Sequence, residues 1–150
     1  MADNLIITIG GGSRGLGKSL LDIFNEKGFN CAAFHRSAEI KYIKNYFFDI
    51  EKEDSLPLII DDLLTLIGNS EFKKYSIHFI SGGGLGVNFL DNNYLSFQKV
   101  LNHNLVVPAT ITSTIFNYLN KNELKKIDLF YYSSAVVENF KASPYYVSAK

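Results

Sequence analysis

The chain has 150 residues, of which 47% are hydrophobic and 14% aromatic, and its fifteen basic residues balance fifteen acidic ones. This is the composition of an ordinary globular domain with a hydrophobic core. The even charge balance argues against nucleic acid or an anionic membrane surface as a partner. No apolar run reaches the roughly 18 residues that a membrane-spanning helix needs. Since the sequence also shows no secretory signal, and its one cysteine, Cys31, is read as a buried inert thiol, we expect a cytoplasmic location.

Short apolar runs alternate with segments of helical period along the chain. The first helix is expected to begin near Leu16 and to stop at Gly28. The second carries apolar residues from Leu56 to Ile67, with Ser55 as its cap. A third helical stretch covers residues 95–119 and is expected to break near Asn104 or at Pro108, and a further helix begins near Tyr145. The expected strands are residues 5–9, 31–34, 46–50, 77–80 and 127–132.

Strands that are apolar throughout, separated by helices, predict a parallel sheet covered on both faces. The fold class is therefore α/β, a doubly wound Rossmann-type sheet in a three-layer α/β/α arrangement. We see no linker or repeat, and treat residues 1–150 as one domain. In such folds the ligand lies beyond the carboxyl ends of the strands.

The most informative segment is the glycine-rich turn of residues 10–17, GGGSRGLG, between the first strand and the first helix. Glycines let the main chain approach a pyrophosphate, and the helix N-terminus offers unpaired N–H groups and a partial positive charge. A rival motif overlaps it, because residues 12–19 also match the G-x-x-x-x-G-K-S phosphate loop of nucleotide triphosphatases, with Lys18 and Ser19 in the phosphate and magnesium positions. That motif needs an acidic residue after a strand, whereas Asp61 and Asp62 fall in a helical period and are expected to face solvent.

The end of the second strand indicates which dinucleotide binds. An NAD-specific fold usually has an acidic residue there, about 20 residues after the glycines, for the ribose 2′-hydroxyl. Here Arg36 stands 19 residues after Gly17, within Phe-His-Arg-Ser. A guanidinium can bind a 2′-phosphate through two hydrogen bonds, and Arg14 adds a second positive charge. We therefore expect NADP(H). His35 has no assigned role and is expected at the surface.

These motifs resemble those of the compact short-chain dehydrogenases/reductases, whose glycine motif is T-G-x-x-x-G-x-G; here Gly10 replaces the threonine. The resemblance implies that Asp49-Ile50 contacts the adenine. It also implies that Ser81-Gly82-Gly83-Gly84 is a degenerate form of the family's N-N-A-G segment. The expected cofactor-binding residues are Gly11, Ser13, Arg14, Gly15, Leu16, Gly17, Arg36, Asp49, Ile50, Ser81, Gly82, Gly83, Tyr146 and Lys150.

The resemblance also implies a catalytic set of Asn104, Ser134, Tyr146 and Lys150. Tyr146 and Lys150 form the family's Y-x-x-x-K motif, twelve residues after Ser134. A free phenol has a pKa of about 10, and a lysine four residues on along one helix face lowers it. Tyr146 would then act as the general acid or base, Ser134 would orient the substrate oxygen, and Asn104 would hold a water that relays protons to Lys150.

We therefore expect an NADPH-dependent oxidoreductase that reduces a carbonyl compound or oxidises an alcohol, with no metal site. Two alternatives stay open: a non-catalytic NADP-binding sensor or scaffold on the same fold, and a phosphate-loop nucleotidase. In the family a long helix and further strands follow Lys150, so a C-terminally truncated chain is expected. The long apolar helix of residues 105–119 is expected to be buried all round, and the resemblance implies a homodimer or tetramer that uses it.

Overall fold

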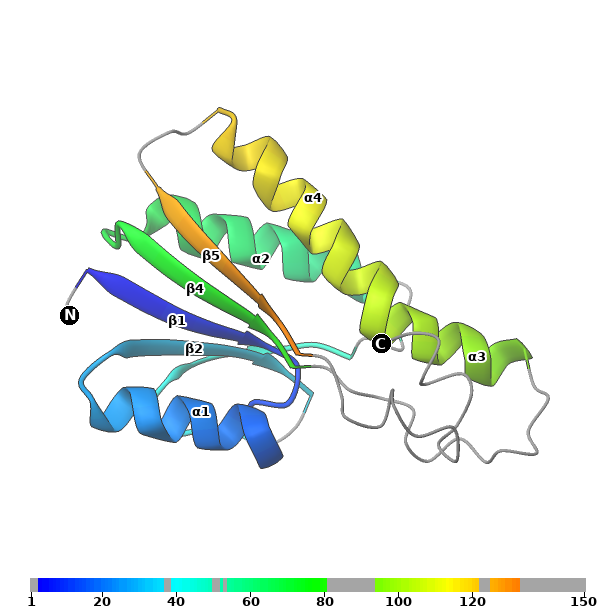
Figure 1. Ribbon diagram of the computed structural model, residues 1–150, viewed down its shortest axis with the longest axis horizontal. Coiled ribbons are helices and arrows are strands. Elements are labelled where there is room, and N and C mark those ends of the chain that lie inside the picture. Colours follow the sequence, from blue (N-terminus) through cyan, green and yellow to red (C-terminus); the bar gives the residue numbers. More distant parts are fainter. Residues whose placement is uncertain are drawn as a thin grey trace.

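The computed structural model describes residues 3–36, 39–49, 52, 54–80, 94–121 and 125–132. Within these ranges, strands alternate with helices along the chain, except that no described helix separates the second strand from the third (Figure 1). The strands are β1 (Asn4–Ile9), β2 (Asn30–His35), β3 (Lys44–Phe47), β4 (Lys74–Phe79) and β5 (Lys126–Tyr131). The helices are α1 (Gly15–Glu26), α2 (Ser55–Asn69), α3 (Tyr94–Leu101) and α4 (Val107–Leu119), with a π-helical segment, η1 (Asn102–Val106), between the last two.

The five strands form one parallel sheet in the order β3-β2-β1-β4-β5. From β1 the chain builds outward through β2 to β3, and it then returns to place β4 on the other side of β1. This reversal makes the carboxyl ends of β1 and β4 the topological switch point, where doubly wound folds bind ligands. The predicted parallel, doubly wound sheet is confirmed.

Helices cover both faces of the sheet, which confirms the predicted three layers (Figure 1). Leu21 of α1 packs with Ile6 and Ala33 on one face. On the other face, α2 and α4 pack together over the main core. The buried members of that core include Ile7, Ile9, Phe34, Ile59, Leu63, Ile67, Tyr75, Ile77, Ile111 and Ile115.

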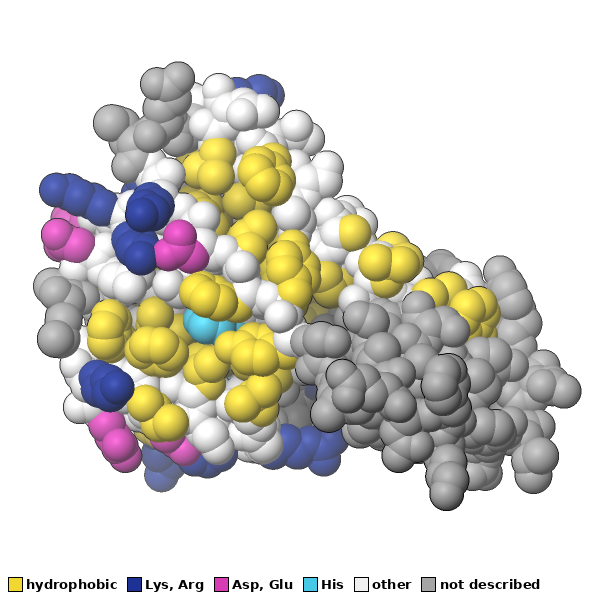
Figure 2. All heavy atoms as spheres, viewed as in Figure 1, with side chains coloured by type: hydrophobic (Ala, Val, Ile, Leu, Met, Phe, Trp, Pro, Cys, Tyr) yellow, Lys and Arg dark blue, Asp and Glu magenta, His cyan; other side chains and the backbone are white. Residues whose placement is uncertain are grey.

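The α1 side of the sheet is only partly covered by the part of the chain that the structure describes. Helix α1 lies against β1 and β2, and Figure 2 shows hydrophobic side chains gathered over the strands beside it. Phe130 of β5 is 43% exposed there and stacks on buried His78 of β4, with ring centroids 4.4 Å apart. Cys31 is buried as expected, and burial raises its pKa to about 11, which keeps the thiol protonated. No described helix is both long and apolar enough to cross a membrane.

The second helix follows the predicted period but begins differently. Ile59 and Leu63 face the core, and Asp61 and Asp62 are exposed, as expected. The prediction that Ser55 caps the helix is wrong. Ser55 is the first helical residue, and its hydroxyl donates to the Asp49 carbonyl oxygen at 2.5 Å instead of accepting an N–H from the first turn.

The helical stretch near Asn104 does not break. Pro108 has no N–H with which to satisfy the carbonyl four residues earlier, and the chain responds with the wider π turn of η1. The N–H of Val107 there donates to the Asn102 carbonyl, five residues back. Within the single chain the following helix is buried on one side only, because Ile111 and Ile115 are buried while Phe116 is 58% exposed.

Candidate functional site

The glycine turn after β1 has a backbone that only glycine adopts readily. Gly10, Gly11 and Gly15 have φ angles of 80°, 64° and 59°, in the left-handed region that penalises a Cβ. The N–H of Gly10 donates to the Phe34 carbonyl of β2 at 2.8 Å. The turn is therefore anchored to β2 while it leads the chain into α1.

The turn is also packed too closely for side chains at several positions. A Cβ on Gly17 would lie 2.3 Å from the Gly11 carbonyl oxygen. A Cβ on Gly12 would lie 2.9 Å from Cβ of Ala33, and one on Gly11 would lie 3.0 Å from Cγ2 of Ile80. The glycines therefore bring α1, the turn and the end of β4 into close contact at the switch point.

The N-terminus of α1 fits a bound phosphate group. Arg14 is the N-cap residue, with an extended backbone (φ −158°) and no side-chain hydrogen bond to the first helical N–H groups. A Cβ on Gly15 would meet no atom within 4 Å, so there is open space beside this residue at the start of the helix. Leu16 is 54% exposed beside it, and Ser13 is half-buried in the turn. Open space, helix N–H groups and a cationic residue are what a pyrophosphate requires.

Arg36 and Asp49 lie at the ends of neighbouring strands, beside this turn in the sheet. Arg36 follows β2 and Asp49 comes shortly after β3, and Nη1 of Arg36 lies 3.9 Å from Oδ1 of Asp49. The side chains are 61% and 28% exposed, respectively. The structure thus brings together the residues predicted to bind a 2′-phosphate and an adenine.

The expectation that His35 lies at the surface is wrong. His35 is 2% exposed, and its Nε2 lies 2.7 Å from Oδ1 of Asn45. The Asn45 amide group donates to the carbonyl oxygens of Ile40 and Ile43, at 2.8 and 3.0 Å, and its Oδ1 accepts from the Ile40 N–H at 3.0 Å. Asn45 therefore closes the connection between β2 and β3 and gives the buried imidazole a partner. The one sequence signal was a polar residue just ahead of the aromatic run Tyr46-Phe47-Phe48.

In the rival phosphate-loop motif, the lysine and the acidic residues do not lie where binding of a nucleotide triphosphate and magnesium would need them. Nζ of Lys18 lies 2.5 Å from Oδ2 of Asp22, one turn further along α1. Tyr42 is hydrogen-bonded to the other oxygen of Asp22. Lys18 is therefore part of an exposed surface network on the helix, and Asp61 and Asp62 are on a helix instead of following a strand.

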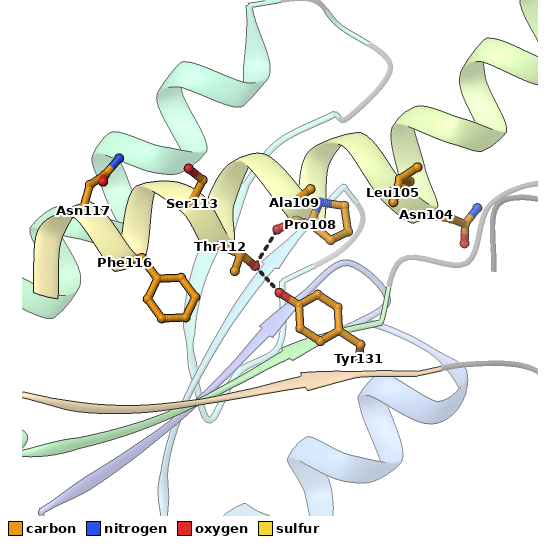
Figure 3. Close-up of a pocket in the computed structure, with 9 residues that line it drawn as sticks. All are labelled: Asn104, Leu105, Pro108, Ala109, Thr112, Ser113, Phe116, Asn117 and Tyr131. Atoms are coloured by element: carbon orange, nitrogen blue, oxygen red, sulfur yellow. Dashed lines mark hydrogen bonds between the residues drawn. The ribbon is translucent and has the colours of Figure 1, made fainter. Parts of the chain in front are cut away.

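Asn104, the predicted catalytic asparagine, lies in η1, and π turns are frequent at functional sites. Its Nδ2 donates to the Val100 carbonyl oxygen at 2.9 Å. It stands at one end of a groove of about 560 Å³ that follows α4 to Asn117 (Figure 3). In that groove the Thr112 hydroxyl is hydrogen-bonded to Tyr131 of β5.

The other predicted site residues lie outside the described ranges. They are Ile50, Ser81, Gly82, Gly83, Ser134, Tyr146 and Lys150. The described residues thus cover the part of the predicted site assigned to the nucleotide, with the glycine turn, Arg36 and Asp49, together with Asn104 on η1.

Comparison with known proteins finds solved structures with a similar fold. No family model and no curated protein sequence matches the chain. Among solved structures, it is similar to a short-chain dehydrogenase/reductase from Burkholderia vietnamiensis, with a TM-score of 0.80, 13% identity, and coverage of 97% of this chain and 73% of that one. It is also similar to the bulky-bulky ketone specific alcohol dehydrogenase from Comamonas testosteroni (TM-score 0.74, 17% identity, 97% and 61% covered). A third is 4-hydroxyisoleucine dehydrogenase complexed with NADH (TM-score 0.76, 20% identity, 97% and 63% covered).

The chain thus spans about two thirds of the length of these three structures. The parallel sheet and the glycine turn at the switch point are consistent with this structural match. The chain has the fold of the short-chain dehydrogenases/reductases.

Proposed function

We propose that the protein is an NADPH-dependent oxidoreductase that transfers hydride between the cofactor and a carbonyl or alcohol substrate. The observation that carries the proposal is the glycine turn at the switch point, with Arg36 at the end of the adjacent strand β2. The bound nicotinamide would supply the hydride. The residues of the chain would bind the cofactor, orient the substrate and move a proton.

The described residues divide the binding task between two ends of the cofactor. The N–H groups at the start of α1 and Arg14 would hold the pyrophosphate. Arg36 would bind the 2′-phosphate, for which its planar group of five donors is suited. A neighbour of the same fold is complexed with NADH, so the preference for NADPH rests on Arg36, on the second positive charge of Arg14 and on the lack of an acidic residue at the end of β2.

The catalytic part of the proposal follows from the resemblance noted in the sequence. Tyr146 would give its phenolic proton to the substrate oxygen, with Lys150 lowering the pKa of the phenol and Ser134 donating a hydrogen bond to the same oxygen. Asn104 would hold a water molecule for proton relay from its place on η1. The substrate would be a small carbonyl or alcohol compound.

Titration of the protein with NADPH, NADH and ATP with magnesium tests the binding half. We expect NADPH to bind most tightly, and Arg36→Leu to remove the preference over NADH. Tight binding of ATP with magnesium and none of NADPH would instead support a phosphate-loop nucleotidase, which the surface pairing of Lys18 with Asp22 argues against.

A screen of carbonyl compounds for NADPH oxidation, on the longest natural form of the protein, tests the catalytic half. Tyr146→Phe should lower the rate by at least about 100-fold, the lower end of what a general acid contributes. A protein that binds NADPH with no turnover of any carbonyl compound would be a sensor or scaffold. Turnover that is unchanged in Tyr146→Phe would remove Tyr146 from catalysis.

A further inference from the structure

Asp49 is placed to do more than contact an adenine. Its carboxylate lies 3.9 Å from the guanidinium of Arg36, the residue assigned above to the 2′-phosphate. We propose that Asp49 is a specificity-determining residue that competes with the 2′-phosphate of NADPH for Arg36. This inference rests on the proposed function, since it concerns the same cofactor site.

The main chain fixes the position of Asp49. Its carbonyl oxygen accepts hydrogen bonds from the N–H of Lys52 at 3.0 Å and from the hydroxyl of Ser55 at 2.5 Å. Just before it, the N–H of Phe48 donates to the carbonyl oxygen of His35 at 3.1 Å. Asp49 is therefore tied both to the first residue of α2 and, through Phe48, to the last residue of β2.

Hydrogen bonds of the preceding residue, His35, also fix the main chain at Arg36. Both amide hydrogens of Asn45 go to carbonyl oxygens of the β2–β3 connection, so Oδ1 is its acceptor and Nε2 of His35 is the donor toward it. This hydrogen bond and the Phe48 N–H fix the residue that precedes Arg36. The two charged side chains thus extend from two anchored strand ends, and their proximity follows from the fold.

A carboxylate at this distance affects the two cofactors differently. Arg36 carries one positive charge, which Asp49 already faces. A 2′-phosphate brings about two negative charges to the same guanidinium, and it is repelled by the carboxylate as well. NADH has an uncharged hydroxyl at that position, so it meets neither effect. Asp49 should therefore weaken NADPH binding selectively.

The adenine contact implied by the family resemblance predicts a different result for Asp49→Asn. An adenine contact is made equally by NADPH and NADH. Loss of that contact would weaken both cofactors by the same factor, and their ratio of dissociation constants would stay the same. The ratio, measured by direct binding, therefore separates the two roles of Asp49.

The test is Asp49→Asn, which removes the charge and keeps the shape of this half-buried side chain. We expect the dissociation constant of NADPH to fall about two- to tenfold. This is the change that the interaction energy of a solvent-accessible ion pair gives when the ligand carries about two charges. That of NADH should change by less than about twofold. The gain for NADPH should shrink between 50 and 500 mM salt, because the effect is one of exposed charges.

Asp62→Asn is the matched control, since it makes the same charge change on the exposed side of α2, and it should leave the ratio unchanged. If Asp49→Asn weakens both cofactors equally, or leaves the ratio unchanged, the inference is overturned while the proposed function stands. If the wild-type protein binds neither cofactor, the proposed function itself fails. Calorimetric titration gives these constants without any measurement of turnover.

Discussion

Gly17 and Gly11 are in contact across the turn that leads into α1, so close that a Cβ on Gly17 would lie 2.3 Å from the Gly11 carbonyl oxygen and 2.7 Å from its carbonyl carbon. Both atoms belong to the main chain, which cannot rotate away as a side chain can. The contact fixes how near the first turn of the helix lies to the end of β1.

Gly17→Ala should therefore displace α1 from the turn. We expect a loss of about 2 kcal/mol or more in the free energy of unfolding, as for other overpacked sites, and at least tenfold weaker NADPH binding. Gly68→Ala is the control, because a Cβ there meets only the hydroxyl of Tyr118, at 3.2 Å, within a helix that alanine favours. Equal urea midpoints for the wild type and Gly17→Ala would show that the turn tolerates a side chain.

The order and type of most elements could be predicted from the sequence because β1 and β2 contain short apolar runs and the helices show an apolar period. The expected strand at residues 5–9 is observed as Asn4–Ile9, and the parallel order follows from the alternation with helices. The third strand was placed too late, at residues 46–50, because its first half is polar. Lys44 and Asn45 belong to the strand. The polar side chain of Asn45 is accommodated there because its amide group donates hydrogen bonds to the carbonyl oxygens of Ile40 and Ile43 in the preceding turn.

The errors arose where a residue depends on partners distant in the sequence. The buried imidazole of His35 has its hydrogen-bond partner in Asn45, ten residues later in the chain. The helix near Asn104 continues because a π turn absorbs the missing N–H of Pro108, which local propensity does not foresee. In the site, the glycine turn was predictable from its local motif, whereas the pairing of Arg36 with Asp49 depends on the registration of β2 with β3.

His78 makes stability depend on pH. The residue is 4% exposed, and its Nδ1 lies 2.8 Å from the Tyr132 hydroxyl. Burial lowers the pKa of His78 from 6.5 to about 4. Between these values the unfolded chain binds the proton and the folded chain does not, so this contribution is complete above pH 6.5 and is lost as the pH falls toward 4.

We expect the free energy of unfolding to drop by about 1–3 kcal/mol from pH 7.5 to pH 4.5 because of this one group. Urea unfolding at several pH values measures it. His78→Phe, which keeps an aromatic ring against Phe130, should lose less over the same range, because the carboxylates contribute alike in both proteins. Parallel pH curves for the two proteins would assign the loss to other groups.

Lys125 binds the end of α2 to the start of β4. Its Nζ donates to the carbonyl oxygens of Ser70 and Phe72, at 2.8 and 3.0 Å, and to the Tyr75 hydroxyl at 3.1 Å. Lys125→Met keeps the aliphatic stem and removes these donors. The free energy of unfolding should fall by about 1–3 kcal/mol, the effect of lost charged hydrogen bonds in a half-buried place. Lys121→Met, at an exposed position, should change it by less than about 0.5 kcal/mol, and equal losses in the two variants would contradict the assignment.

The outer side of α4 is apolar and exposed, and we propose that it mediates self-association. Phe116 of α4 is 58% exposed, and the groove beside it is also lined by Leu105 of η1 and Tyr131 of β5, which are 54% and 55% exposed (Figure 3). Exposed apolar residues that line one groove are typical of a protein interface. A second copy of the chain, with the same groove and the same helix, would bury them by twofold symmetry.

Phe116→Lys should therefore shift the protein toward monomer, because it places a charge in the centre of that contact, where an unpaired buried charge costs several kcal/mol. Sedimentation velocity at about 1 to 100 µM, a range wide enough to resolve dissociation constants near the micromolar level, measures the shift. Leu58→Lys, at a 63% exposed leucine on α2, is the matched control and should leave the oligomeric state unchanged. If the wild-type protein sediments as a monomer at every concentration, this face of α4 is not a self-association interface. The same conclusion follows if Phe116→Lys and Leu58→Lys dissociate to the same extent.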